Sequence, residues 1–144
     1  MMRTPMTRIA RCCCGALRAE TTGEPAGVAV CHCTECQRRS GSVFAANTYF
    51  RKEQVRTEGV SKVYVRDGQD GRKVRIHFCP ECGTSVYWQA DFLPRHIGVA
   101  YGAFADPSLP PPTLSAWEQT RHPWVVFGHV INGFPQAVTH AAKD

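Results

Sequence analysis

The 144-residue chain is 43% hydrophobic and 20% charged, with a net charge of +5 and eight cysteines. This length fits one globular domain with its own hydrophobic core, and the composition excludes a disordered or collagen-like chain. No stretch approaches the roughly 18 uninterrupted apolar residues of a membrane span, and residues 1–11 lack the apolar stretch of a secretory signal. Because the positive charges are scattered, a nucleic-acid-binding tail is not indicated. We therefore expect a cytoplasmic protein with neither membrane nor nucleic acid as partner.

Short apolar or alternating segments between turn residues predict a mostly β domain of short antiparallel strands. The expected strands, in chain order, cover residues 16–20, 28–30, 43–50, 54–58, 61–66, 72–78 and 85–88, followed by an apolar segment at 96–104. The aspartates and glycines of residues 67–71 predict a turn, and the prolines of 106–112 an exposed, extended connector. Late apolar anchors are expected at Trp117, Trp124 and 125–127. The predicted domain spans residues 9–137, between a flexible segment at 1–8 and a tail at 138–144.

The cysteines lie in three clusters, which are Cys12-Cys13-Cys14, Cys31-x-Cys33-x-x-Cys36 and Cys79-x-x-Cys82. In a reducing cytosol such clusters are typical of metal sites, and cysteines one or two residues apart are poor disulfide partners. Three thiolates within six residues can converge on one zinc ion and leave its fourth position open, which is the pattern of a catalytic site. The central cluster therefore predicts an open zinc site at the end of a strand.

The remaining thiols suit a second, closed site. Cys12 and Cys14 lie two residues apart and point to the same side of an extended chain, whereas Cys13 points away. Together with Cys79 and Cys82 they complete a four-thiolate structural site, whose binding free energy would contribute to folding. The predicted cofactor is thus zinc, two ions per chain, with Cys13 left over as a small core residue.

A rival assignment closes the central site with a histidine or an aspartate, which would make both sites structural. His32 lies between two ligands and is expected to face the other way. His77 is in phase with Cys79 and is the more credible of the two, although a strand histidine usually serves packing or a hydrogen bond.

The cysteine pattern and the residues that follow each cluster resemble a known family. These residues are Gly15-Ala16-Leu17-Arg18 after the first cluster, Arg38-x-Ser40-Gly41-x-x-Phe44-Ala45 after the second and Gly83-Thr84 after the third. The family is the glutathione-dependent formaldehyde-activating enzyme family, which includes the centromere protein V relatives. The resemblance implies a Mss4-like β fold. It also implies a structural zinc on Cys12, Cys14, Cys79 and Cys82 and a catalytic zinc on Cys31, Cys33 and Cys36.

The resemblance further implies a carbon–sulfur lyase reaction, in which formaldehyde and glutathione form S-hydroxymethylglutathione. A small thiol and a small aldehyde are then the expected partners. Arg38, Arg39 and Ser40 are candidate contacts for the carboxylates of the thiol, or else they cap the loop and offset thiolate charge. The aromatic residues that are candidates for a pocket lining are Tyr49, Tyr64, Tyr87, Trp88 and Tyr101, most of which should belong to the core or sheet surface. The alternative function is a non-catalytic, zinc-stabilised binding module for a protein or nucleic-acid partner.

Overall fold

The computed structural model describes residues 4–68 and 71–138. Its strands and helices, in chain order, are β1 (Thr7–Arg11), β2 (Arg18–Thr22), β3 (Gly27–Cys31), α1 (Thr34–Ser40), β4 (Ala45–Arg51), β5 (Val55–Glu58), β6 (Lys62–Asp67), β7 (Lys73–Phe78), β8 (Ser85–Ala90), β9 (His96–Ala100), α2 (Tyr101–Phe104), β10 (Leu114–Ala116) and β11 (Asn132–Gly133). The expected turn over 67–71 includes residues 69–70, and the expected terminal segments include 1–3 and 139–144, which lie outside the described residues. Because β1 begins at Thr7, Thr7 and Arg8 lie in a strand and not in the segment expected before the domain.

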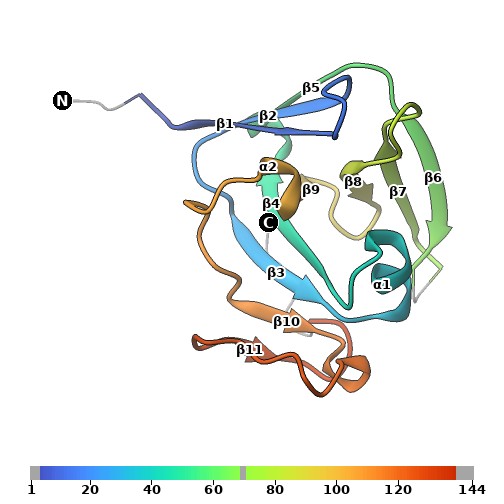
Figure 1. Ribbon diagram of the computed structural model, residues 1–144, viewed down its shortest axis with the longest axis vertical. Helices are drawn as coiled ribbons and strands as arrows, with labels where there is room; N and C mark the ends of the chain where they lie inside the picture. Colours follow the sequence, from blue (N-terminus) through green and yellow to red (C-terminus); the bar gives the residue numbers. More distant parts are fainter. Residues whose placement is uncertain (1–3, 69–70, 139–144) are drawn as a thin grey trace.

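Two sheets of short strands form the molecule (Figure 1). The smaller has the order β1-β2-β5 and the larger the order β11-β10-β3-β4-β9-β8-β7-β6. Cysteine clusters lie at the ends of β1, β3 and β7. The predicted mostly β class is confirmed, and the architecture is that of a small Mss4-like β domain.

The side chains of β4 alternate between two clusters of buried residues, one on each face of the larger sheet. Phe50 packs with residues of β1 and β2 in the main core, between the two sheets. Its neighbour Tyr49 packs with Trp88 and Ile76 in a second cluster. Since successive side chains of a strand point to opposite faces, the second cluster lies on the other face of the larger sheet.

One edge departs from the expected antiparallel pairing, because β10 pairs in parallel with both β3 and β11. The connector that leads to β10 is also not fully exposed. Leu109 is 4% exposed and belongs to the main core, and the Tyr101 hydroxyl lies 3.2 Å from the carbonyl oxygens of Leu109 and Pro110. A single apolar residue among prolines was therefore enough to fix this segment on the core.

Helix α1 was not predicted, because its seven residues carry no apolar stripe beyond the buried Cys36. Local capping explains it. The sulfur of Cys33 accepts a hydrogen bond from the Cys36 N–H at 3.2 Å, and Gly41 ends the helix with a φ of 69°. The left-handed conformation at a helix end favours glycine. The helix lies between the start of β4 and the lower end of β6 (Figure 1).

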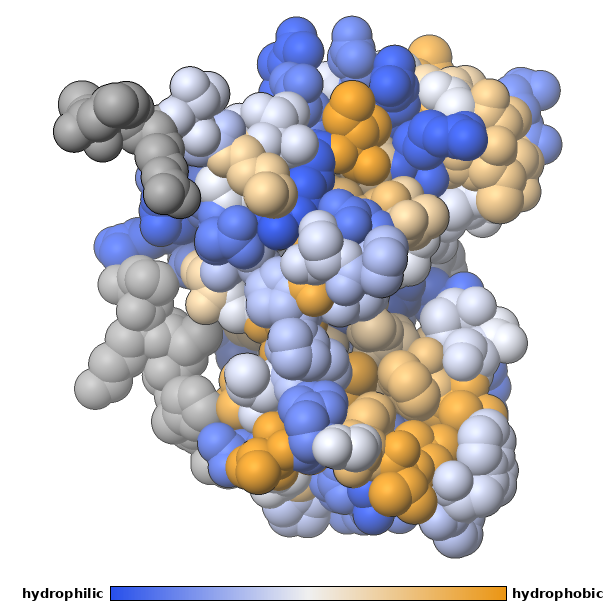
Figure 2. Space-filling view, turned by 60° about the vertical axis from the view of Figure 1, so that its left-hand side comes forward, coloured by the Kyte–Doolittle hydropathy of each residue, from blue (hydrophilic) through white to orange (hydrophobic). Residues whose placement is uncertain are grey.

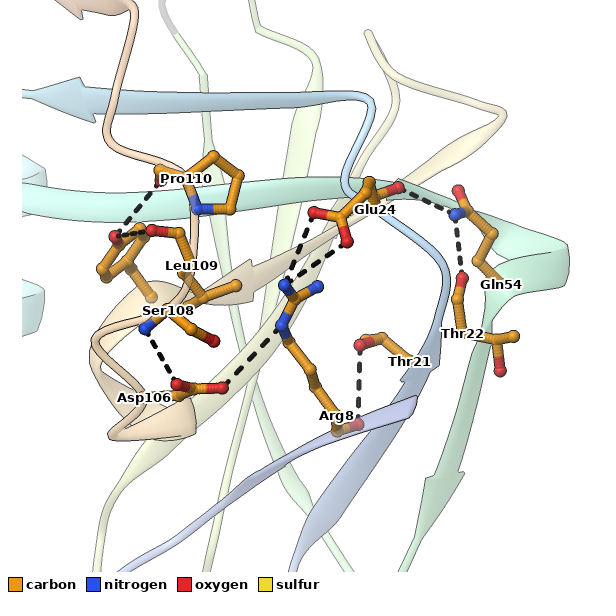
Figure 3. Close-up of polar contacts among 10 residues, drawn as sticks. Arg8, Thr21, Thr22, Glu24, Gln54, Asp106, Ser108, Leu109 and Pro110 are labelled. Carbon is orange, nitrogen blue, oxygen red and sulfur yellow. Dashed lines mark hydrogen bonds and ion pairs between the residues drawn. The ribbon is translucent and has the colours of Figure 1, made fainter. Parts of the chain in front are cut away.

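A buried arginine ties β1 to two loops (Figure 3). The Arg8 side chain is 5% exposed, and its guanidinium lies 3.4 Å from Glu24 and 3.8 Å from Asp106. The charge of Arg8 and the hydrogen bonds that Asp106 accepts from Ser108 hold the pKa of Asp106 below its usual range, with the Ser108 bonds contributing most. A buried charge needs such partners, so this contact holds the loop after α2 against β1.

Hydrophobic residues reach the surface in the lower part of the molecule, the part that β10 and β11 occupy (Figure 2). Trp124, expected as an apolar anchor, is 70% exposed, and Val126 and Val130 are also exposed, whereas Val125 is buried. In the described residues, no helix has the length and apolar character needed to cross a membrane.

Candidate metal centre

In the structure the cysteines form two clusters, and the first of them gathers four thiols from two hairpins. Cys12 and Cys14 follow β1, and Cys79 and Cys82 follow β7, yet all four Sγ atoms lie within 4.8 Å of one another. The sulfurs of Cys12 and Cys14, and those of Cys14 and Cys79, are 3.6 Å apart. Two backbone N–H groups donate to sulfurs, from Leu17 to Cys12 at 3.2 Å and from Glu81 to Cys79 at 3.4 Å. Such donors favour the thiolate over the thiol.

The second cluster comes from six consecutive residues. Cys31 ends β3, Cys33 is the N-cap of α1 and Cys36 lies in its first turn, and their Sγ atoms also lie within 4.8 Å of one another. Among the described residues, no further histidine, cysteine or carboxylate joins this group. The cluster is therefore a three-ligand set in this part of the chain.

Both clusters fit a zinc ion. With a zinc–sulfur distance of about 2.3 Å, the sulfurs of a tetrahedral site lie about 3.8 Å apart. The first cluster has separations of 3.6 Å, and all sulfurs of the second lie within 4.8 Å of one another. Soft thiolates in a tetrahedral arrangement favour zinc over magnesium or calcium. The cluster of Cys12, Cys14, Cys79 and Cys82 has the ligand number of a closed site, and that of Cys31, Cys33 and Cys36 the number of an open one.

Contacts within the second cluster favour the thiolate at Cys33 over those at Cys31 and Cys36. Hydrogen bonds from Cys31 and Cys36 lower the pKa of Cys33 to about 2. The same contact with Cys33 raises the pKa of Cys31. Removing the remaining protons would place like charges side by side, so a cation is needed to hold all three as thiolates.

The face of the sheet beside this cluster is polar and aromatic. Cys31 lies opposite Ala45, so Asn47 and Tyr49, two and four residues further along β4, share its face. The Trp88 Nε1 donates to the Asn47 Oδ1 at 3.2 Å, and the Tyr49 and Trp88 rings meet edge to face at 5.5 Å and 87°. The side chain of Asn47 is 3% exposed, so this contact is fixed within the sheet.

Gly98 makes this contact between Tyr49 and Trp88 possible. It lies between them in the sheet, opposite Tyr49 on one side and Trp88 on the other. A Cβ atom at Gly98 would lie 2.1 Å from Trp88 Cε2, because the indole lies over the glycine.

We expect Gly98→Ala to lower the free energy of unfolding by about 1–3 kcal/mol, the usual cost of an overpacked core. Gly27→Ala is the matched control, since Gly27 also lies opposite Tyr49 but an added Cβ meets nothing within 4 Å. Chemical denaturation measures both variants. Equal stability of the two alanine variants would contradict this account of Trp88.

Two arginines place positive charge at the second cluster. Arg39, in the last turn of α1, acts on Cys36, and Arg66, near the end of β6, acts on Cys33. Arg38 differs from Arg39, because its side chain is 73% exposed and pairs with Glu35 at 3.2 Å. The Ser40 hydroxyl accepts a hydrogen bond from the Ser42 N–H at 3.1 Å and thereby caps the loop after α1.

A groove of about 740 Å³ runs from the loop after α1 to the first cysteine cluster. Arg11 and Arg39 line it, together with Ser40, Cys13 and Ala45, the residue opposite Cys31. This volume lies within the range of sites that bind small organic molecules. The groove therefore offers cationic and hydroxyl groups near the end of β3.

The two histidines considered as ligands have other partners. His32 is fully buried and faces away from the cluster, with its Nε2 2.9 Å from the Ser115 hydroxyl. Burial lowers its pKa. The ring nitrogens of His77 lie 2.9 Å from Ser61 Oγ and 3.2 Å from Gln89 Oε1.

Cys13 is exposed and lines the groove, so the expectation of a core residue is wrong. The physical reason is local. Its N–H donates to the Thr84 hydroxyl at 3.1 Å. This bond holds the backbone between Cys12 and Cys14 against the turn that follows Cys82, and the Cys13 side chain points outward.

Residues 7–120 match the family described as glutathione-dependent formaldehyde-activating enzyme. The chain belongs to this family. No curated protein matches the chain. A Rhodobacter sphaeroides protein of known crystal structure, a Northeast Structural Genomics target, is similar with a TM-score of 0.53 and 23% identity, over 72% of this chain and 91% of that chain. At this identity the similarity concerns the fold.

Asn47 and Arg66 are site neighbours that the sequence did not single out. Asn47 had no signal of its own, because its place beside the cluster follows from the pairing of Ala45 with Cys31, which the structure shows. Arg66 had none, because it comes from a hairpin whose position relative to α1 depends on the whole sheet. Tyr49, one of five aromatic candidates, is the tyrosine on which the charges of Cys31 and Cys36 act.

Proposed function

We propose that the protein is a zinc-dependent carbon–sulfur lyase-type enzyme, which joins a small thiol such as glutathione to a small aldehyde or cleaves the adduct. The observation that carries the proposal is the three-thiol cluster of Cys31, Cys33 and Cys36 in a member of this family. A closed four-thiol cluster elsewhere in the chain leaves the three-thiol cluster free of a purely structural task.

Cys31, Cys33 and Cys36 would hold the reactive zinc, and Cys12, Cys14, Cys79 and Cys82 the structural one. Zinc with an open position supplies a site where a substrate thiol is present as thiolate at neutral pH. The chain's own residues then bind and orient the substrate. Attack by the thiolate sulfur on the aldehyde carbon forms the carbon–sulfur bond, and the carbonyl π electrons move to oxygen, which takes a proton from water.

Arg39 is the best-placed contact for a carboxylate of the thiol. It lines the groove and its charge acts on Cys36, so one side chain connects the cluster with the groove. Arg66 adds a second cation, whose charge acts on Cys33. Guanidinium groups bind carboxylates through paired hydrogen bonds. Arg38 and Ser40 are weaker candidates, because Glu35 and the loop after α1 occupy them.

Exchange NMR of formaldehyde with glutathione tests the reaction directly. We expect the zinc-loaded protein to accelerate interconversion of the free thiol and its hydroxymethyl adduct over buffer and over zinc ions alone. Cys13→Ser is the control that keeps both clusters and should retain this acceleration. No acceleration at high protein concentration would refute the reaction and favour the non-catalytic binding module, while leaving family and fold unchanged.

A further inference from the structure

Tyr49 lies on the face of the sheet that carries the three-thiol cluster. It shares that face with Cys31 through the pairing of β3 with β4. Its ring is held edge to face by Trp88 at 5.5 Å, and the indole is in turn fixed by its hydrogen bond to the buried Asn47. No side chain rises from Gly27 or Gly98, the residues opposite Tyr49 on either side. The Trp88 indole lies over Gly98 and fixes the phenol on that side, whereas a Cβ added at Gly27 would meet nothing within 4 Å.

The charges of the three-thiol cluster act on the hydroxyl group of Tyr49. Burial raises its pKa, and the charges of Cys31 and Cys36 raise it further. The side-chain hydrogen bond with Asn47 has the opposite effect and lowers the pKa of Tyr49, as a bond from a donor amide does. A tyrosine in this setting keeps its proton at neutral pH, so its O–H group is available as a hydrogen-bond donor on the face of the sheet that carries Cys31.

We propose that Tyr49 donates a hydrogen bond to the aldehyde oxygen as a substrate thiolate adds to the carbonyl carbon beside Cys31, Cys33 and Cys36. The inference rests on the proposed function and adds a catalytic residue to it. In the step, the sulfur–carbon bond forms and the carbon–oxygen π pair becomes a negative charge on oxygen. Tyr49 stabilises that charge and retains its proton. Water supplies the proton that completes the hydroxymethyl group, and water has taken the proton of the thiol.

A donor placed where charge develops acts more strongly on the transition state than on the substrate. Arg39 supports this arrangement, because its positive charge acts on Tyr49 as well as on Cys36. The two groups approach the cluster from different elements, β4 and α1. The substrate oxygen is thereby expected between them, on the side of the cluster that faces the sheet.

The test compares Tyr49→Phe with Tyr101→Phe. The control also removes one hydroxyl, but that hydroxyl donates to the carbonyls of Leu109 and Pro110. Calorimetry of the zinc-loaded proteins measures binding of S-methylglutathione and of the glutathione–formaldehyde adduct, which differ by one hydroxyl. We expect Tyr49→Phe to weaken adduct binding about tenfold, the effect of losing one hydrogen bond, and to leave S-methylglutathione unchanged. The value of kcat should fall at least as much, with KM for glutathione unchanged. Tyr101→Phe should change none of these quantities.

Equal weakening of both ligands, or no change, would overturn the role of Tyr49. If wild type and Tyr49→Phe accelerate the exchange equally well, this inference alone is refuted. Wild type without acceleration would refute the proposed function and this inference with it. If Tyr49→Phe fails to fold, wild type labelled at tyrosine Cζ gives the answer by NMR. The Tyr49 resonance can be assigned from phenylalanine variants of the other three tyrosines. It should shift when the adduct binds and stay unshifted with S-methylglutathione. No shift with the adduct would overturn the proposal.

Discussion

Replacing Cys79 by serine is expected to unfold the protein and to release its zinc. Cys79 is fully buried in the main core and belongs to the cluster that joins the hairpins β1–β2 and β7–β8. Cys14 and Cys79 are 65 residues apart in sequence, so a metal bound between them closes a long loop. Structural zinc contributes about 10 kcal/mol or more of folding free energy in small domains, which is comparable with the total stability of a domain.

Far-UV circular dichroism and zinc per chain measure this loss. Cys13→Ser is the matched control, because Cys13 lies between Cys12 and Cys14, two members of the same four-thiol cluster, but belongs to neither cluster. We expect it to keep both zinc equivalents and the wild-type melting temperature. A Cys79→Ser protein that retains a cooperative thermal transition near that of wild type would show that the four-thiol cluster does not hold the fold together.

The cysteine spacing alone divided the thiols into the two groups that the structure brings together. This was possible because each group is specified by local chemistry. C-x-x-C after an alternating strand places two sulfurs in one turn, and C-x-C places two side chains on one side of the chain. The helix that follows Cys33 was missed, since it depends on capping by a sulfur and by Gly41 and has no apolar periodicity.

The alternating strands were also recognisable, and their bounds differ from the observed ones by one to two residues at most positions. The neighbours of β10 were not, because a three-residue strand carries too little pattern to indicate its partner or direction. Parallel pairing of β10 with β3 depends on where the connector places Leu114, and that in turn depends on burial of Leu109. These are tertiary effects with no counterpart in local sequence.

The surroundings of the open cluster depend on register between distant strands. Tyr49 and Trp88 meet because both lie in one row across β4, β9 and β8, with Gly98 between them. A one-residue shift in any of these pairs would turn the side chains to the opposite face. The sequence contains all three residues without indicating that they share a row, so the ligands of a site can be predicted well before the groups that act on its substrate.

Replacing Cys33 by serine is expected to abolish catalysis and leave the fold nearly intact. All three sulfurs of this cluster come from residues 31–36, so a metal bound there closes only a short loop and stabilises little long-range structure. Serine is also a favourable N-cap residue, so the hydrogen bond from the Cys36 N–H that begins α1 can be kept. The variant should retain one of the two zinc equivalents expected of wild type, and a melting temperature close to that of wild type.

Zinc analysis, circular dichroism and exchange NMR on the same sample separate the roles of the two clusters. Cys33→Ala provides a graded comparison, since it also removes the cap of α1, at a cost of about 1 kcal/mol. Loss of both zinc equivalents and of the folded state in Cys33→Ser would assign the second cluster to the structural frame and refute the open-site account. Retention of full activity with one zinc equivalent would move the reaction away from these thiols altogether. The expected result, a folded and inactive protein with its four-thiol site filled, requires the two clusters to differ as their positions in the chain indicate: one joins distant hairpins, and the other is built within a single turn and left open.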